Sequence, residues 1–281
     1  MNDLSIGNQL IVHIYTLISN HLTMKQLILA LALTSALFSC KKETTTPTTS
    51  NPPTPTNSVV CVDNPSINFT ALGTPVGKFS DCIKDVDGNV YKTVTIGTQT
   101  WMAENLKVSK YSDGTIIPNV KDSIEWSKLT TGAWVYYNND VVNNADYGKL
   151  YNWYAVSKTT NGNKNVCPTG WHVPTDAEWT VLTDYLGGAS IAGGKIKEVG
   201  TTSWESPNIE ATNISLFTGL PGGDRYNDGS YNNVGYNGYW WSSTEYGTSS
   251  AWSRSLSLIN GNAYRGSANK GNGFSVRCLR D

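Results

Sequence analysis

The stretch from Gly222 to Glu245 concentrates the side chains of this sequence that could bind a ligand. Carboxylates, amides and aromatic rings alternate along it, in what we expect to be a long loop. Carboxylate and amide oxygens are the ligands that calcium prefers, and flat aromatic faces suit sugar rings. The candidate binding residues are Asp224, Arg225, Asn227, Asp228, Trp240, Trp241 and Glu245.

A purely structural interpretation of the same stretch is the alternative. Asp224 and Arg225 would pair with each other, and the Asn-Asp-Gly sequence at residues 227–229 would form a turn. Because side chains alternate along a strand, only one of Trp240 and Trp241 could face the core, which would leave the other at the surface. Under this interpretation the stretch supports the fold and binds nothing.

Residues 24–40 have the pattern of a bacterial lipoprotein signal. Lys25 supplies the positive start. Residues 27–38 form an apolar run that is too short to span a bilayer as a helix but suits the hydrophobic part of a signal peptide. The run is followed by Cys40 and resembles the site where a lipoprotein signal peptidase cuts before a lipid-modified cysteine. We therefore predict that residues 24–39 are a signal peptide and that Cys40 carries lipid; the alternative is a buried helix with a chance cysteine.

The segments on either side of this signal have simple compositions. Residues 40–58 are rich in Thr and Pro and offer almost nothing apolar to bury, so they cannot offset the entropy of ordering. We expect them to form an extended, semi-stiff tether. Residues 1–23 contain no Lys or Arg, which makes them a poor start for a signal, and Met24 is a better one. We therefore expect residues 1–23 not to belong to the natural protein.

Four further cysteines remain if Cys40 is lipidated, namely Cys61, Cys82, Cys167 and Cys278. An even number in an exported chain suggests disulfides, and four cysteines allow three pairings; buried free thiols are the alternative. We expect Cys61 and Cys82 to pair because they lie close together in residues 59–84, a stretch of little periodicity that we interpret as an irregular lead-in. No short cysteine spacing exists and the chain has only 3 His, so a zinc site is not expected.

Composition narrows the class of protein. The net charge is −1 and no dense basic stripe is present, so a nucleic-acid partner is not expected. Only 15% of the residues are charged, while the chain has 10 Trp and 15 Tyr. This composition favours an exported domain that is rich in strands and loops.

The main domain, at residues 85–281, begins with a predicted hairpin. Residues 90–96 alternate and are β-branched, and residues 99–102 follow after a Gly-Thr turn. Asp85 and Asp87 precede the hairpin and superficially suggest a calcium loop, but Ile96 stands where such a loop requires Glu. We expect only a turn that leads into a strand.

Later elements place the candidate residues in an α+β domain with short antiparallel sheets and one or two helices. Thr175 and Glu178 form a capping box, and Gly187-Gly188 ends the helix that they start. Residues 148–157 could form a second, short helix. The other predicted strands are residues 214–220, 238–243, 251–258, 262–266 and 274–280.

Several phrases of the sequence resemble a known family. DVDGNVYKTVTIGTQTWMAENL, YGKLYNWYAV, CPTGWHVPTDAEW, GGDRYNDGSY, YWWSSTE and GFSVRCLRD occur in the order found in the Fibrobacter succinogenes major paralogous domain. The resemblance covers roughly Asp85 to Asp281. It implies a surface or exported bacterial protein, often a lipoprotein, and no known activity.

A more distant resemblance bears on the fold. WHVPTDAEW and GFSVRC are similar to segments of the formylglycine-generating, sulfatase-modifying family, whose fold is C-type-lectin-like. The resemblance implies that fold here. In lectin-like folds the two ends of the domain meet in one sheet, which implies a disulfide between Cys167 and Cys278. The enzymes of that family hold copper with a pair of nearby cysteines, whereas Cys167 and Cys278 each stand alone in a structural context, so we do not expect an enzyme.

These inferences lead to a lipid-anchored, exported protein at the outer membrane or cell surface. Its lectin-like domain is expected to bind an extracellular ligand such as a glycan or a surface protein. A structural or fimbria-like surface component is the alternative, and a formylglycine-generating enzyme is least expected. The calcium-lectin motifs EPN, QPD and WND are absent, so we expect no metal and no cofactor, and a melting temperature that a chelator does not change.

Overall fold

A computed structural model describes residues 74–281, which belong to the unit Asn57–Asp281. The predictions that lie outside the described residues are those for residues 1–23, the signal peptide at 24–39, Cys40, the tether at 40–58 and Cys61. Within residues 74–281, no helix is long and apolar enough to cross a bilayer.

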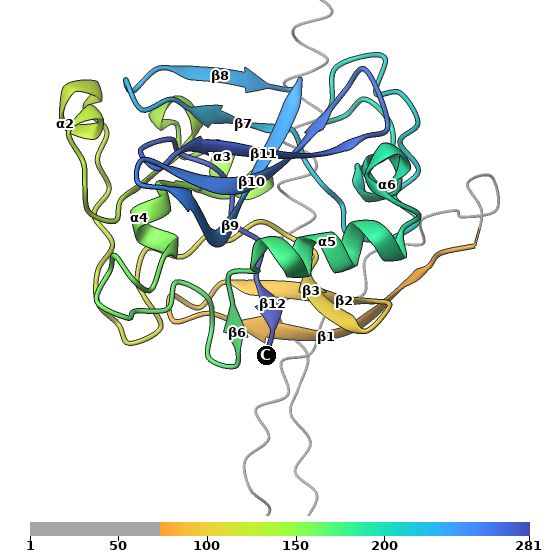
Figure 1. Ribbon diagram of the computed structural model, residues 1–281, viewed down its shortest axis with the longest axis horizontal. Coiled ribbons are helices and arrows are strands. Elements are labelled where there is room, and N and C mark those ends of the chain that lie inside the picture. The colour runs from red at the N-terminus through yellow and green to blue at the C-terminus, as the bar shows by residue number, and fades with distance from the viewer. Residues whose placement is uncertain (1–73) are drawn as a thin grey trace, which may run out of the picture. The chain divides into compact units, whose positions relative to one another are not determined.

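The first sheet joins the two ends of the described chain (Figure 1). Its strands, in spatial order, are β1 (Gly77–Lys84), β2 (Val90–Ile96), β3 (Gln99–Met102), β12 (Leu279–Arg280) and β6 (Trp171–His172). The predicted hairpin is therefore β2 and β3, with Val94 opposite Trp101. The last strand, β12, lies between β3 and β6, so the end of the chain is held inside the sheet.

The second sheet contains most of the candidate residues. Its strands, in spatial order, are β11 (Ala263–Asn269), β10 (Ser250–Ser257), β9 (Asn237–Gly247), β7 (Gly222–Arg225) and β8 (Tyr231–Val234). β7 runs parallel to β9, and the other neighbours are antiparallel. A separate pair, β4 (Trp134–Val135) and β5 (Leu150–Tyr151), forms a two-stranded sheet.

Five α-helices are described, where one or two were predicted, and most of them are short. They are α2 (Ser123–Ser127), α3 (Asn143–Asp146), α4 (Trp153–Val156), α5 (Asp176–Tyr185) and α6 (Ala189–Ile196), with a 3-10 turn η2 at Tyr137–Asn139. The predicted capping box starts α5, because Thr175 accepts from the amide of Glu178 while the Glu178 side chain accepts from the amide of Thr175. The α+β class and the loop-rich character are confirmed.

The core lies on both sides of the second sheet. One cluster packs Trp241 of β9 against Phe274, Trp153 and Met102. A second cluster packs Trp240 of the same strand against α5, α6 and the first sheet. In Figure 1, α5 lies between the first sheet, which is below it in the view, and the second sheet, which is above it. Both faces of β9 are therefore covered by protein at Trp240 and Trp241.

Residues 77–84 correct the prediction of an irregular lead-in. They form β1, which pairs with β2 from Gly77 opposite Ile96 to Lys84 opposite Val90. Most of the β1 side chains are exposed, so the strand lacks the alternation of apolar residues by which a half-buried strand is recognised. Cys82 is disulfide-bonded, but Cys61 lies outside the described residues, so the pairing of the two stays a prediction.

The predicted strand at residues 214–220 is wrong. Leu216 and Thr218 have φ angles of 60° and 54°, which a strand does not allow. Asn213 holds this turn, because its side-chain oxygen accepts from the amide of Thr218 at 2.9 Å. The fully buried Arg277 donates to the carbonyl oxygens of Phe217 and Thr218. Hydrogen bonds from distant residues thus override the local β propensity.

Two other predicted elements differ in extent, and one helix was not predicted. Residues 148–157 divide into β5 and α4, because Asn152 caps α4 by accepting from the amide of Ala155 at 3.1 Å. Of residues 274–280, only Leu279 and Arg280 form a strand. Helix α6 was not predicted because Gly193 and Gly194 lie inside it. Gly193 is needed there, since a Cβ atom would lie 2.1 Å from the carbonyl oxygen of Asn262.

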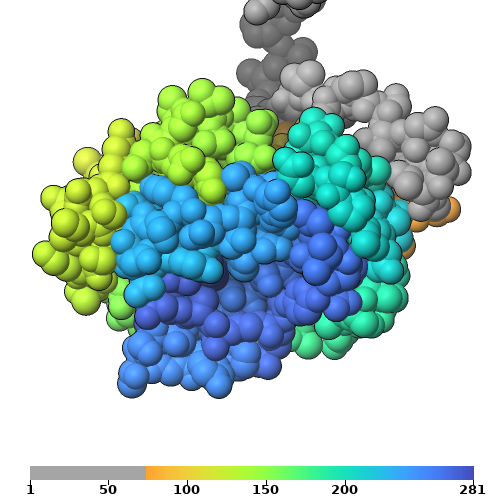
Figure 2. Space-filling model, turned by 90° about the horizontal axis from the view of Figure 1, so that it is seen from above, coloured from red at the N-terminus to blue at the C-terminus, as the bar shows by residue number. Residues whose placement is uncertain are grey.

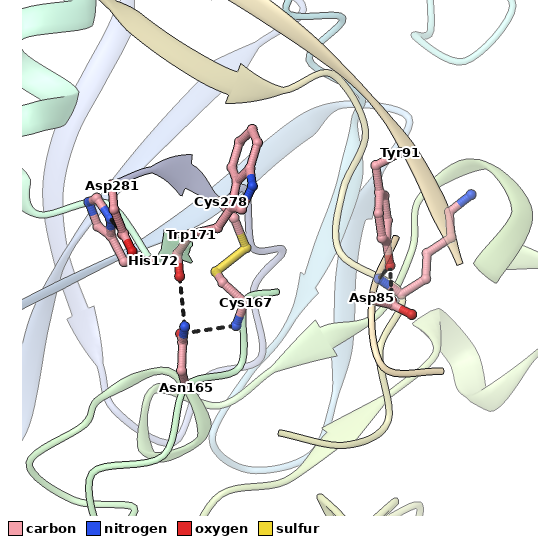
Figure 3. The surroundings of a disulfide bond; sticks show 9 residues. Asp85, Tyr91, Asn165, Cys167, Trp171, His172, Cys278 and Asp281 are labelled. Carbon is pink, nitrogen blue, oxygen red and sulfur yellow. Dashed lines mark hydrogen bonds and ion pairs between the residues drawn. A yellow bond between two sulfur atoms is a disulfide. The ribbon is translucent and has the colours of Figure 1, made fainter. Parts of the chain in front are cut away.

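The disulfide between Cys167 and Cys278 is confirmed (Figure 3). It closes a separation of 111 residues, and the two Cα atoms are 5.9 Å apart. Both cysteines are fully buried. Asn165 fixes the entry to the bond by accepting from the amide of Cys167 at 3.1 Å and donating to the carbonyl oxygen of Trp171 at 2.7 Å.

Candidate ligand-binding site

The structure separates the predicted binding residues instead of gathering them in one loop. Asp224 and Arg225 lie in β7, Asn227 and Asp228 lie in the turn between β7 and β8, and Trp240, Trp241 and Glu245 lie in β9. The expected long loop is therefore a hairpin followed by a long strand. Each residue has a different environment, and most of them serve the fold.

Arg225 is fully buried and holds the β7–β8 hairpin to the segment before α2. Its guanidinium donates to the carbonyl oxygens of Val120 at 2.7 Å and Lys121 at 2.9 Å. It lies over the rings of Trp126 and Tyr231, at 4.5 and 5.0 Å from their centroids. It makes no ion pair with Asp224, so the predicted pairing of these two residues is wrong.

Asn227 and Asp228 form the predicted turn. Asp228 accepts from the hydroxyl of Ser230 at 2.7 Å and from its amide at 2.9 Å. The Ser230 hydroxyl and amide lower the pKa of Asp228. The amide of Asn227 donates to the side chain of Asn272 at 3.0 Å. These are the contacts of a surface turn.

Trp240 and Trp241 correct the expectation that one of them is exposed. They point to opposite faces of β9, as alternation requires, yet only 1% and 0% of their surfaces are exposed. The Trp240 indole donates to Asn105 at 2.9 Å, and the Trp241 indole donates to the carbonyl oxygen of Tyr151 at 2.8 Å. At these two residues both faces of β9 are covered by protein. The alternation of side chains therefore directs Trp240 into one hydrophobic core and Trp241 into another, and neither into solvent.

Glu245 also has a structural partner. The ammonium group of Lys270 donates to its carboxylate and to the carbonyl oxygen of Thr248. Lys270 itself is buried, with its ammonium 4.8 Å from the centre of the Trp153 ring. Glu245 therefore neutralises a buried cation at the end of β9.

Among the predicted binding residues, Asp224 is the one whose carboxylate keeps free hydrogen-bonding capacity within the described part of the chain. Its side chain is buried, with 1% of the residue surface exposed. One carboxylate oxygen accepts from the side-chain amide of Asn233 at 2.8 Å, and the other has no hydrogen-bond partner among residues 74–281. Burial raises the pKa of Asp224 to about 6, and the bond from Asn233 opposes that rise only in part.

Tyr239 extends this group along β9. Its hydroxyl oxygen accepts from the side-chain amide of Asn237 at 3.0 Å and from that of Asn233 at 3.4 Å. Asn233 therefore connects Tyr239 to Asp224. Burial, and after it the charge of Asp224, raises the pKa of Tyr239 to about 12, so this hydroxyl keeps its proton at physiological pH.

Tyr264 of β11 repeats the arrangement two strands away. Its hydroxyl oxygen accepts from the side-chain amides of Asn260 at 2.7 Å and Asn262 at 3.2 Å. Ser255 of β10 lies opposite Tyr239 on one side and opposite Tyr264 on the other. Directly opposite residues share a face of a sheet, so both tyrosines project from the same face, about 10 Å or two strand spacings apart.

We call this group the tyrosine face; it consists of Asp224, Asn233, Asn237, Tyr239, Ser255, Asn260, Asn262 and Tyr264. It crosses the second sheet from the β7–β8 hairpin to β11. Figure 2 shows the side of the molecule on which the light-blue β7–β8 hairpin and the darker blue segments that follow it in the chain reach the surface. Among residues 74–281, no group of three or more His, Cys, Asp or Glu side chains could hold a metal ion.

The available hydrogen-bonding groups define the chemistry of the tyrosine face. A tyrosine hydroxyl that accepts from two amides still has its own proton to donate. Neither Tyr239 nor Tyr264 donates to an acceptor among residues 74–281. The open oxygen of Asp224 is an acceptor close to Tyr239. Such a mixture of donors and acceptors is complementary to a ligand with several hydroxyl groups.

Most of the tyrosine face was missed by the sequence analysis. A signal exists, because Asn237 and Tyr239, and likewise Asn262 and Tyr264, are two residues apart on a strand and so share a face. The register that brings the two Asn-x-Tyr pairs together is not visible in the sequence.

Comparison with known proteins identifies the family. Searches of curated proteins and of solved structures give no match to the chain. The Fibrobacter succinogenes major domain matches residues 94–280, which include the whole tyrosine face and the Cys167–Cys278 disulfide. The chain belongs to the Fibrobacter succinogenes major domain family.

Proposed function

We propose that the domain is the ligand-binding part of an exported lipoprotein, and that its tyrosine face binds a polyhydroxylated ligand of the glycan type. The observation that carries this proposal is the state of the two tyrosine hydroxyls. Tyr239 and Tyr264 are each held by two asparagine amides. Neither hydroxyl donates a hydrogen bond to an acceptor among the described residues, so both protons are available to a ligand.

The rest of the face supports the same ligand class. Asp224 and the asparagine side chains add planar polar groups that can exchange hydrogen bonds with vicinal hydroxyls. Only Asp224 carries a charge on this face, which favours a neutral or basic ligand over an acidic one. Trp240 and Trp241 are no part of the proposal because both are buried.

A glycan array probed with the full chain tests the proposal, with and without calcium. We expect binding to one class of glycan in both conditions. Tyr239→Phe removes a single hydroxyl and should weaken that binding, whereas Tyr185→Phe, at an exposed position of α5, is the matched control and should not. Equal binding by all three proteins would refute a role for the tyrosine face, and the absence of any glycan signal would refute the glycan class.

The lipid anchor is a separate part of the proposal, carried by the apolar run that precedes Cys40. Metabolic labelling with a fatty-acid analogue should mark the natural protein and the Cys61→Ala variant, but not Cys40→Ala. Equal labelling of Cys40→Ala would contradict the anchor. An outer-membrane or cell-surface location follows from the anchor and is tested by fractionation of the same cells.

We further propose that the domain is C-type-lectin-like in fold. What supports this is the first sheet, where β12 at the end of the chain pairs with β3 near the start of the domain. An experimental structure superposed on lectin domains is the test. A catalytic role like that of the formylglycine-generating enzymes is not proposed, because Cys167 and Cys278 are buried and bonded to each other.

A further inference from the structure

Asp224 differs from Asp85, the other buried aspartate among residues 74–281, in how little its charge is compensated. Asp85 accepts from the amides of Asp87 and Asn89, from the Asn89 side chain and from the Tyr91 hydroxyl, all within 2.9 Å (Figure 3 shows the Tyr91 contact). Asp224 accepts one amide hydrogen bond, from Asn233. A native buried polar group that is left half satisfied calls for an explanation.

The missing partner of Asp224 is not among residues 74–281. Asp224 forms no ion pair with Lys or Arg of residues 74–281, and the neighbouring titratable groups that its charge affects are Tyr137 and Tyr239. The completely buried side-chain oxygens without a partner belong to Asn144, Glu198 and Asn208. The open oxygen of Asp224 is not one of them, so a small part of its surface remains in contact with solvent, although only 1% of the residue is exposed.

The chemistry of this oxygen specifies its partner. It is an acceptor on a group that carries a negative charge when ionised, and such groups bind charged donors most strongly. A divalent metal ion would need several oxygen ligands of this kind, and the described residues offer no such cluster. An ammonium group needs fewer partners, because one charge-assisted hydrogen bond to the open carboxylate oxygen of Asp224 already binds it.

We propose that Asp224 forms an amine subsite of the tyrosine face, which binds the free amino group of an amino sugar. This rests on the proposed function, because the hydroxyls of the same sugar chain would lie along Tyr239, Ser255 and Tyr264. The carboxylate sits at one end of that row, next to Asn233. A ligand with an amine on one sugar ring and hydroxyls on the next could therefore bond to Asp224 through the amine and to the row of hydroxyl side chains through its hydroxyls.

Titration calorimetry with the full chain tests the amine subsite in a calcium-free buffer at neutral pH. Three oligosaccharides of equal length and linkage are the probes, built from glucosamine, N-acetylglucosamine and glucose. The glucosamine oligomer should bind about tenfold more tightly than the other two, as expected for one charge-assisted contact. The variant Asp224→Asn keeps the shape of the side chain and should remove this preference.

Asp228→Asn is the matched control, because Asp228 is an exposed carboxylate on the same hairpin and bonds only to Ser230. It should keep the preference, and thermal melting should show that both variants are folded. Equal or weaker binding of the glucosamine oligomer, or a preference that survives Asp224→Asn, overturns the amine subsite. If the glucose oligomer binds equally well and Tyr239→Phe weakens it, the amine subsite is wrong while the proposed function stands.

Discussion

Two carboxylates that contact the second sheet have opposite environments. Asp176, at the start of α5, accepts from Arg254 at 2.7 Å and from two nitrogens of Arg265 at 2.7 and 3.0 Å. Asp224, in β7, accepts from one amide. Burial raises the pKa of Asp176, but the bonds and charges of Arg265 and Arg254 outweigh it and the net pKa is lowered. Burial raises the pKa of Asp224, and little opposes it.

The difference separates a region whose polar side chains all have partners among residues 74–281 from a region in which some do not. The residues around Asp176 form what we call the α5 cap region, which consists of Cys167, His172, Thr175, Asp176 and Glu178. Each polar side chain of this region has a hydrogen-bond or ion-pair partner, and Cys167 is in a disulfide bond. His172, for example, lies 2.6 Å from Asp281 and 3.0 Å from Glu178. Charges that are compensated stabilise the fold, whereas an uncompensated buried charge opposes it. Asp224 is thus a residue of the tyrosine face at which the protein gives up stability, as functional sites often do.

The largest effect should come from breaking the disulfide that closes the α5 cap region. Cys278→Ser opens a loop of 111 residues, for which chain-entropy estimates give about 4–5 kcal/mol in the free energy of unfolding. Chemical denaturation measures this loss. Cys61→Ser should cost about 3 kcal/mol if Cys61 pairs with Cys82, because the loop is shorter. A smaller loss for Cys278→Ser than for Cys61→Ser would show that the long bridge does not hold the domain together.

Asp176→Asn should have the next largest effect. Arg254 is buried and would lose its carboxylate partner, and breaking a buried ion pair in this way costs about 3–5 kcal/mol. Because the pKa of Asp176 is lowered on folding, its contribution is fully present above the ordinary value of 3.8 and is lost as the pH falls through the folded value. Unfolding measured at pH 7 and pH 3 checks this. The difference in the free energy of unfolding between the natural protein and the variant should be smaller at pH 3 than at pH 7.

Asp224→Asn should act in the opposite direction and stabilise the protein. The carboxyl pKa is raised to about 6 from an ordinary 3.8. The folded state therefore favours the protonated acid, and stability falls as the pH rises through about 6. Asn does not ionise, so the variant should gain about 2–3 kcal/mol at pH 8 and little at pH 3. Denaturation curves at the two pH values measure the gain. A loss of stability at pH 8 would mean that Asp224 is a structural residue like Asp176.

The α5 cap region was largely predictable from the sequence, because its signals are local. Thr175 and Glu178 are three residues apart, and the glycines that end α5 follow directly. The same holds for the β2–β3 hairpin and for the strands at residues 238–243 and 251–258. The Cys167–Cys278 pairing came from a resemblance that placed both ends of the domain in one sheet.

The tyrosine face could not be predicted in the same way. Its residues come from five strands and a turn, and the register of Ser255 places Tyr239 and Tyr264 on the same face of the sheet. Trp240 and Trp241 show a related limit: the alternation of the strand was right, but no local pattern reveals that a second core covers the other face. Asp224 was identified from its residue type, whereas its lone contact with Asn233 depends on the β7–β8 hairpin.

The smallest change in stability should come from Tyr264→Phe, which tests the tyrosine face without disturbing the core. The Tyr264 ring is 44% exposed, and its hydroxyl bonds only the side chains of Asn260 and Asn262, which solvent can satisfy instead. The free energy of unfolding should therefore change by less than about 0.5 kcal/mol. Glycan affinity should nevertheless fall several-fold, because a fixed hydroxyl donor is lost. A matched loss of stability and affinity would make Tyr264 a structural residue, whereas unchanged affinity would remove β11 from the binding site and confine it to Asp224 and Tyr239.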